Sequence, residues 1–253
     1  MSDLASLELW SSAVALCALA LFAGATVKGV VGLGLPLIAV PFMTLIVSLP
    51  TAVAILTLPI IIANIWQGLQ TGLALPIIRR FWPAALALTA GIWGGVRLMI
   101  ALDPRVLSVV LGLAVILSVL TTWFRPSVRI PERSERPVGI VIGLIAGVLG
   151  GTSTFFGPPL FVYLVGLKLD KEEFITAIAF LYLCGGLPLA LALLVFGVMG
   201  IHELTLSALA LIPVSAGMLL GQRIRAAMNA RLFLNVTLVV MLITGIGLIY
   251  KAL

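Results

Sequence analysis

Long apolar stretches fill almost the whole chain and are separated by only short polar segments. They cover residues 9–48, 50–70, 81–102, 104–124, 138–167, 174–200, 204–222 and 231–250. A helix needs about 20 apolar residues to cross the hydrocarbon of a membrane, whereas a barrel strand alternates in polarity and needs about 10. Stretches of this length predict an all-α integral membrane protein built as a helical bundle.

The composition supports the same class. Hydrophobic residues make up 62% of the 253 residues and charged residues only 9%, and the mean hydropathy is +1.28. A soluble domain carries roughly 25% charged residues. The net charge of +6 comes mainly from arginines in short polar segments. Orientation in the membrane explains this charge, so we expect membrane lipids and no nucleic acid as partners.

The few reactive side chains give no sign of a cofactor or metal. Cys17 and Cys184 both lie in apolar runs, so they are interpreted as small core residues and not as a disulfide or a metal pair. Asp3 and Glu8 stand where a cleavable signal peptide would carry a basic flank, so the first apolar segment is expected to stay in the mature protein.

The chain matches itself when it is shifted by about half its length. Residues 34–37 (GLPL) match residues 157–160 (GPPL) at an offset of 123, which pairs Lys28 with Gly151. At an offset of 126, a second group matches: Gly91, Gly95, Arg97, Ala101 and Arg105 with Gly217, Gly221, Arg223, Ala227 and Arg231. We therefore predict two transmembrane repeats, residues 1–124 and 138–253, joined by a polar cytoplasmic linker, residues 125–137. Internal duplication is typical of membrane transporters.

The positions of the arginines predict how the repeats are oriented. Arginines in short loops favour the cytoplasmic side, and three arginine-rich segments are expected there: the linker, Arg79–Arg80 and residues 223–231. They can all lie on that side only if segment 138–167 enters the membrane and leaves on the side from which it came. Two arms of about 15 residues, near 22 Å each, would go deep without crossing. Segment 9–48 would form the matching hairpin from the opposite face. Each half then holds one re-entrant hairpin and three transmembrane helices, which gives inverted repeats. Eight full spans in parallel repeats are the alternative.

Glycines and prolines interrupt the helical pattern at both hairpin tips. Such broken backbone is tolerated at membrane depth only where it is buried in protein or lines a cavity. A new helix start presents free N–H groups and a positive dipole end, so two facing tips predict an anion-binding centre. The candidate substrate-binding residues at the tips are Lys28, Gly29, Gly32, Gly34, Pro36, Thr152, Ser153, Thr154, Gly157 and Pro158. Lys28 adds a full positive charge, unless it snorkels to the interface.

Other polar residues lie within reach of this centre. Asn64 and Gln67 follow one helical face and are added to the substrate-binding set, although Gln67, like Gln70, is equally well placed at the interface. Arg97 and Arg223 are tentative pathway residues; snorkelling or contact with lipid phosphate is the alternative for both.

The tip motifs resemble a known family. The first half contains the run Gly-x-Gly-x-Pro-Leu-Ile-x-Val-Pro at residues 32–41. The second half contains a similar run, Gly-Gly-x-x-x-x-x-Gly-Pro-Pro-Leu, at residues 150–160. Together with the length and the duplication, these runs resemble the TauE/SafE family, described as sulfite and organosulfonate exporters. The resemblance implies a multi-pass protein of the bacterial cytoplasmic (inner) membrane that moves small sulfur-containing anions. In this chain Thr152, Ser153 and Thr154 occupy a tip that is often more glycine-rich.

The predicted function is transport, in the export direction, of sulfite or a small organosulfonate. Acidic residues, the usual proton or sodium couplers, are missing from the central spans, and an inside-negative potential favours anion exit by about 2.3 kcal/mol per charge per 100 mV. The alternatives are an intramembrane enzyme with Ser153 activated by Lys28, which is not the favoured class, and a transporter of small organic carboxylates. The sequence is also compatible with a homodimer.

Overall fold

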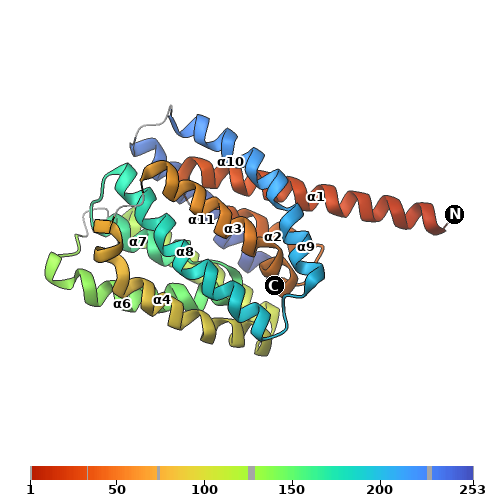
Figure 1. Ribbon diagram of the computed structural model, residues 1–253, viewed down its shortest axis with the longest axis horizontal. Coiled ribbons are helices and arrows are strands. Elements are labelled where there is room, and N and C mark those ends of the chain that lie inside the picture. The colour runs from red at the N-terminus through yellow and green to blue at the C-terminus, as the bar shows by residue number, and fades with distance from the viewer. Residues whose placement is uncertain (1, 33, 73–74, 125–128, 227–229, 253) are drawn as a thin grey trace.

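The fold is described from a computed structural model, for residues 2–32, 34–72, 75–124, 129–226 and 230–252. All regular elements of these residues are helices (Figure 1). They are α1 (Ser2–Val31), α2 (Leu35–Met43), α3 (Leu49–Thr71), α4 (Leu75–Ala101), α5 (Pro104–Phe124), α6 (Glu132–Ser153), α7 (Gly157–Gly166), α8 (Lys171–Val195), α9 (Ile201–Leu209), α10 (Leu211–Ala226) and α11 (Ala230–Ala252). The beginning of α1 projects beyond the rest of the bundle (Figure 1).

The helices have the length and the surface of a membrane bundle. Six stretches among the described residues are long and apolar enough to cross a membrane: Ser12–Val30, Leu49–Gln70, Leu75–Ala101, Glu132–Ser153, Lys171–Val195 and Ile201–Arg225. Large apolar side chains also cover the outer surface; Leu86, Leu117 and Ile243 are 61%, 63% and 66% exposed. A surface of this kind suits lipid and not water, so the predicted multi-pass helical membrane protein is confirmed.

Both predicted hairpins are present as broken helices, but their arms are unequal. Two arms of about 15 residues were expected, and the structure instead joins a long first arm to a short second one. In the second hairpin, α6 has 22 residues and α7 has 10. In the first, α1 has 30 residues and α2 has 9. The prediction of equal arms is wrong, although the turns lie close to the midpoint of each apolar run. The arms differ because α1 and α6 begin before the runs, at Ser2 and Glu132, and α2 and α7 end after 9 and 10 residues.

The helix boundaries of the two hairpins correspond at an offset of 122 residues. The first arms end at Val31 and Ser153, the second arms begin at Leu35 and Gly157, and α3 and α8 begin at Leu49 and Lys171. The expected offset of 123 is therefore wrong by one residue. The similar glycine-proline motifs at residues 34–37 and 157–160 suggested an offset of 123. In the structure the two turns superpose in sequence at 122, so Gly32 corresponds to Thr154 and Lys28 corresponds to Gly150. Gly32 and Thr154 both have positive φ, 82° and 65°.

The long first arms pack against α4 and α10 through glycines that bring two backbones together. A Cβ at Gly95 of α4 would lie 2.3 Å from the Val148 carbonyl oxygen of α6. A Cβ at Gly221 of α10 would lie 2.1 Å from the Thr26 carbonyl oxygen of α1. Val148 and Thr26 again differ by 122, and Gly95 and Gly221 by the predicted 126. Small residues at such positions allow close helix contact in membranes.

The relative directions of the helices follow from the same contacts. In α4 and α6 the residue numbers of contacting positions increase in the same direction: Gly91 contacts Leu144, and Gly95 contacts Val148. These two helices therefore run parallel. Along α5 and α11 the residue numbers run in opposite senses, because Gly112 meets Ile249 while Gly245 meets Ile116. The helices that correspond at an offset of 126, α5 and α11, are therefore antiparallel.

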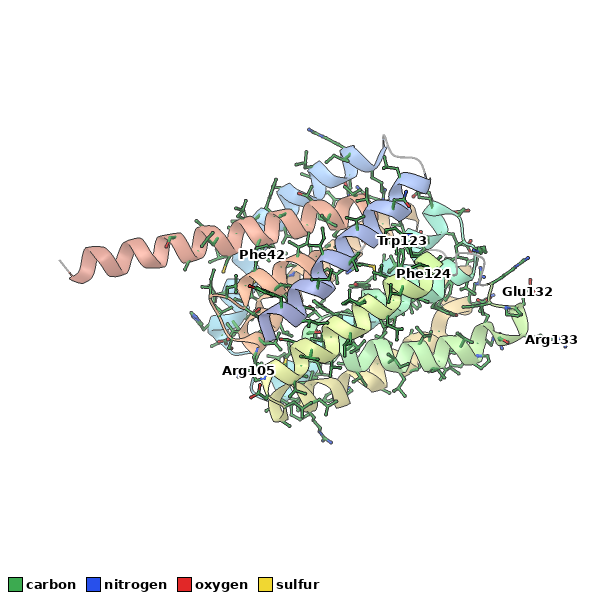
Figure 2. The ribbon with its side chains drawn as sticks, turned by 180° about the vertical axis from the view of Figure 1, so that it is seen from behind. Phe42, Arg105, Trp123, Phe124, Glu132 and Arg133 are labelled. Carbon is green, nitrogen blue, oxygen red and sulfur yellow. The ribbon has the colours of Figure 1, made fainter. Side chains whose placement is uncertain are left out.

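Charged residues gather at one end of the bundle. Arg80 donates from Nε and Nη2 to the two carboxylate oxygens of Glu135, at 2.6 and 3.1 Å, and from Nη1 to Glu173, at 2.8 Å. Lys171 donates to the Arg225 carbonyl at 3.2 Å. The beginnings of α4, α6 and α8 and the end of α10 thus lie together. Arg105, by contrast, lies at the end opposite Glu132 and Arg133 (Figure 2).

Two boundaries differ from the sequence-based expectation. The run expected over residues 204–222 is two helices, α9 and α10, because Pro213 cannot donate a helical hydrogen bond to Leu209, where α9 ends. The polar segment expected as a linker over residues 125–137 becomes helical at Glu132, and residues 125–128 lie outside the described residues.

Candidate substrate-binding site

The first hairpin ends on a buried lysine. Lys28 lies in the last turn of α1 and is only 1% exposed, so the alternative of a snorkelling lysine is wrong. Gly32 then takes φ 82° and donates its N–H to the Lys28 carbonyl at 2.7 Å, which ends the helix. Glycine adopts this left-handed conformation without the steric penalty of a side chain. The turn therefore fixes the lysine inside the bundle.

Three neutral groups surround the Lys28 amine. Nζ donates to Asn64 Oδ1 at 2.8 Å and to the Gly32 carbonyl at 3.1 Å, and it lies 5.0 Å from the centre of the Tyr182 ring. Asn64 Nδ2 donates to the Ile60 carbonyl at 2.6 Å, so its Oδ1 is turned toward the lysine. An ammonium has three N–H donors and no acceptor. Two carbonyl oxygens and an aromatic face thus share the charge.

Tyr182 connects this lysine with the second hairpin tip. Its side chain is 1% exposed. Gly157 is the first residue of α7, where backbone N–H groups have no partner within the helix. Phe156 packs edge-on against Tyr182 with 5.1 Å between ring centroids. The two tips therefore meet around one aromatic side chain.

The hydroxyl groups of the second tip donate hydrogen bonds to nearby backbone carbonyls. Thr152 and Ser153 both donate to the Leu149 carbonyl, at 2.8 and 2.9 Å, and Thr154 donates to the Ser153 carbonyl. They were expected to add donors for an anion, and in this arrangement those donors are engaged. The contacts of Ser153 and Lys28 also give no support to a Ser–Lys nucleophile pair.

The structure places the other predicted residues in different surroundings. Asn64 and Gln67 are buried beside Lys28, and Gln67 Nε2 donates to the Lys28 carbonyl at 3.5 Å, whereas Gln70 is exposed. Pro36 and Pro158 are the second residues of α2 and α7.

Gly29 packs against α10, where a Cβ would lie 2.6 Å from the Met218 carbonyl oxygen, so its role is in helix packing. Gly34 has φ 127°, and a Cβ there would meet Val27 at 2.7 Å. Arg97 and Arg223 are exposed, and Arg97 lies over the Phe196 ring at 5.6 Å. The structure therefore does not bring the two arginines to the buried centre.

Sequence reasoning missed Tyr182 and Phe156. Tyr182 carries a polar hydroxyl inside the apolar run 174–200, and an isolated polar group at such a depth needs a buried partner. That rule could have selected Tyr182. Phe156 carries no polar group and looks like any other core residue in the sequence.

These features define a class: a multi-pass helical membrane protein with a buried cationic centre between two broken helices. The chain belongs to the sulfite exporter TauE/SafE family, whose model matches residues 16–248. This match confirms the resemblance seen in the tip motifs. Neither the curated proteins nor the solved structures yield a match to the chain.

Proposed function

We propose that this protein exports a small anion, sulfite or a small organosulfonate, which binds at the Lys28 centre between the hairpin tips. The observation that carries the proposal is the burial of Lys28 among neutral partners only. An ionised amine inside a membrane protein is costly, about 2.5 to 3.5 kcal/mol on insertion scales, and such residues mark substrate or ion pathways. An anion would stabilise this charge better than a carbonyl oxygen does.

We further propose that the two halves are inverted repeats with the charged end in the cytoplasm. The common offsets of the helix boundaries and the antiparallel pair α5 and α11 support inversion. The positions of Arg80, Lys171 and Arg225 at one end, together with the positive-inside rule, support the orientation. Inverted repeats provide a route to alternating access, because the same centre can face either side as one half rocks against the other.

The direction of transport follows from charge. An inside-negative potential drives an anion outward by about 2.3 kcal/mol per charge per 100 mV, so export requires no coupling ion. In proteoliposomes we therefore expect an imposed inside-negative potential to speed efflux of labelled sulfite or methanesulfonate. An efflux rate that does not change with the imposed potential would contradict export without a coupling ion.

Substitution of the lysine tests the site itself. Lys28→Gln removes the charge but keeps a polar side chain of similar length, and anion affinity should fall about ten- to a hundredfold, the range of a charge-assisted hydrogen bond. Lys28→Arg should keep part of the activity, because the planar guanidinium needs different geometry. Affinity is measured by thermal stabilisation and by flux in liposomes.

Arg79→Gln is the matched control, because it removes one positive charge from an exposed position. It should leave affinity unchanged. Unchanged affinity in Lys28→Gln would exclude Lys28 as the anion contact. A panel that adds small carboxylates decides between sulfur anions and the carboxylate alternative.

A further inference from the structure

Among the residues that the structure describes, the contacts of the Lys28 amine are all with uncharged groups. Within the part of the chain that the structure describes, Lys28 is the buried side chain that can carry a full charge, and the other buried polar side chains are hydroxyls and amides. Arg80 lies between Glu135 and Glu173 at the charged end of the bundle. The centre thus offers one positive charge.

From this charge count we infer that the site is built for a monoanion and disfavours a dianion of the same size. The inference rests on the proposed function and narrows its substrate class. A monoanion beside Lys28 makes the centre neutral, whereas a dianion leaves a net negative charge among buried, uncharged groups. An uncompensated buried charge is strongly unfavourable.

The helix ends at the tips do not alter this balance. The amino end of a helix carries a positive charge of about half a unit, spread over its free N–H groups. At α7 the first three residues are Gly157, Pro158 and Pro159, and the two prolines have no N–H to offer. The hydroxyls of Thr152, Ser153 and Thr154, which could otherwise add donors, bond to backbone carbonyls. Lys28 therefore dominates the electrostatics of the centre.

Methanesulfonate and sulfate test the inference directly. Both are tetrahedral sulfur anions, and they differ by a methyl group in place of a charged oxygen. Perchlorate has four oxygens like sulfate but one charge, so it separates the effect of charge from that of the methyl group. Competition against labelled methanesulfonate uptake in proteoliposomes should rank both monoanions at least about tenfold above sulfate. Equal competition by sulfate would overturn the inference.

Two variants test the charge count at Lys28. In Lys28→Gln both anions should compete more weakly, and sulfate should lose at least as much as methanesulfonate, because the lysine attracts two negative charges more strongly than one. In the exposed control Arg79→Gln both anions should compete as they do in the wild-type chain. Asn64→Asp puts a carboxylate beside the amine, which makes the empty centre neutral, and it also removes the donor to the Ile60 carbonyl. Methanesulfonate competition should then weaken at least about tenfold, with normal yield of folded protein.

Each outcome separates this inference from the proposed function. A gain of sulfate over methanesulfonate in Lys28→Gln, or methanesulfonate affinity that survives in Asn64→Asp, would overturn the monoanion inference while transport stands. Absence of flux for every anion in the wild-type chain would instead refute the proposed function.

Discussion

The two hairpin tips have the same backbone frame and opposite chemistry. Both first arms end one residue before a left-handed position, Gly32 in the first hairpin and Thr154 in the second, and each of these residues donates its N–H to the carbonyl four positions earlier. Those carbonyls belong to Lys28 and to Gly150. At the position where the first hairpin carries the buried charge, the second has no side chain at all.

The reason for the difference is space. A Cβ at Gly150 would lie 1.9 Å from the Phe156 ring, so the aromatic side chain occupies the volume that a side chain at position 150 would need. Asn64, which orients Lys28, corresponds at the same offset to Gly186. The second half thus supplies small residues and the Tyr182 ring, beside which the charge lies, and Phe156 packs against Tyr182. The comparison teaches that the two tips share a backbone conformation, while one half alone supplies the charge.

The largest loss of stability is expected where glycines bring the backbones of two helices into contact. Gly95→Ala places a Cβ 2.3 Å from the Val148 carbonyl oxygen, which is backbone and cannot rotate away. We expect a loss of about 3 kcal/mol in unfolding free energy, the upper part of the range for overpacking. Gly221→Ala, with 2.1 Å to the Thr26 carbonyl oxygen, should cost a similar amount. Unfolding in mixed micelles titrated with a denaturing detergent measures both.

Gly94→Ala is the control for this prediction. It is adjacent to Gly95 in α4, and a Cβ there meets nothing within 4 Å. Because alanine favours helix more than glycine does, this variant should be unchanged or gain up to about 1 kcal/mol. If Gly95→Ala and Gly221→Ala differ widely in cost, the two helix contacts are not equivalent and the common frame is refuted.

A smaller effect, of opposite sign in the two halves, is expected at the left-handed residues. Gly32→Ala forces a side chain into a conformation that disfavours Cβ by about 1 to 2 kcal/mol, so it should destabilise the protein by that amount. Thr154→Gly removes the same strain at φ 65° but adds chain entropy, so it should change the unfolding free energy by at most about 1 kcal/mol, on the stabilising side. Loss of stability in Thr154→Gly would show that the threonine side chain maintains the second tip.

The sequence predicted this frame better than it predicted the chemistry of the centre. Long apolar runs located the helices, and glycine with proline located both breaks, because these signals are local. The glycine-proline letters misplaced the register by one, since Gly34 and Gly157 look alike in sequence although only Gly34 has positive φ. Lys28 and Asn64 were found as isolated polar groups in apolar runs. Phe156 was not, because its role depends on contacts across the fold.

A further effect is expected at two prolines, which lie at different positions in the two halves. Pro59 in α3 and Pro188 in α8 each lack an N–H, so the carbonyls four residues earlier, of Ile55 and Cys184, lose their helical donor. Ser207 of α9 donates to Ile55 at 2.8 Å, and Thr89 of α4 donates to Cys184 at 2.9 Å. A hydroxyl from the neighbouring helix thus replaces the missing bond in each half.

Ser207 makes one bond more than Thr89, and this difference sets the expected order. Its hydroxyl also accepts the Leu58 N–H at 3.1 Å, so Ser207→Ala leaves two backbone groups without this partner. Thr89→Val keeps the side-chain shape and leaves one. Hydrogen bonds between membrane helices contribute about 0.6 kcal/mol on average and up to about 1.7. We therefore expect Ser207→Ala to cost near the upper value and Thr89→Val near the average, by the same detergent titration. Equal or reversed costs would mean that the carbonyls of Ile55 and Cys184 find other partners once the hydroxyl is removed, and that the hydroxyls do not stabilise α3 and α8 at their prolines.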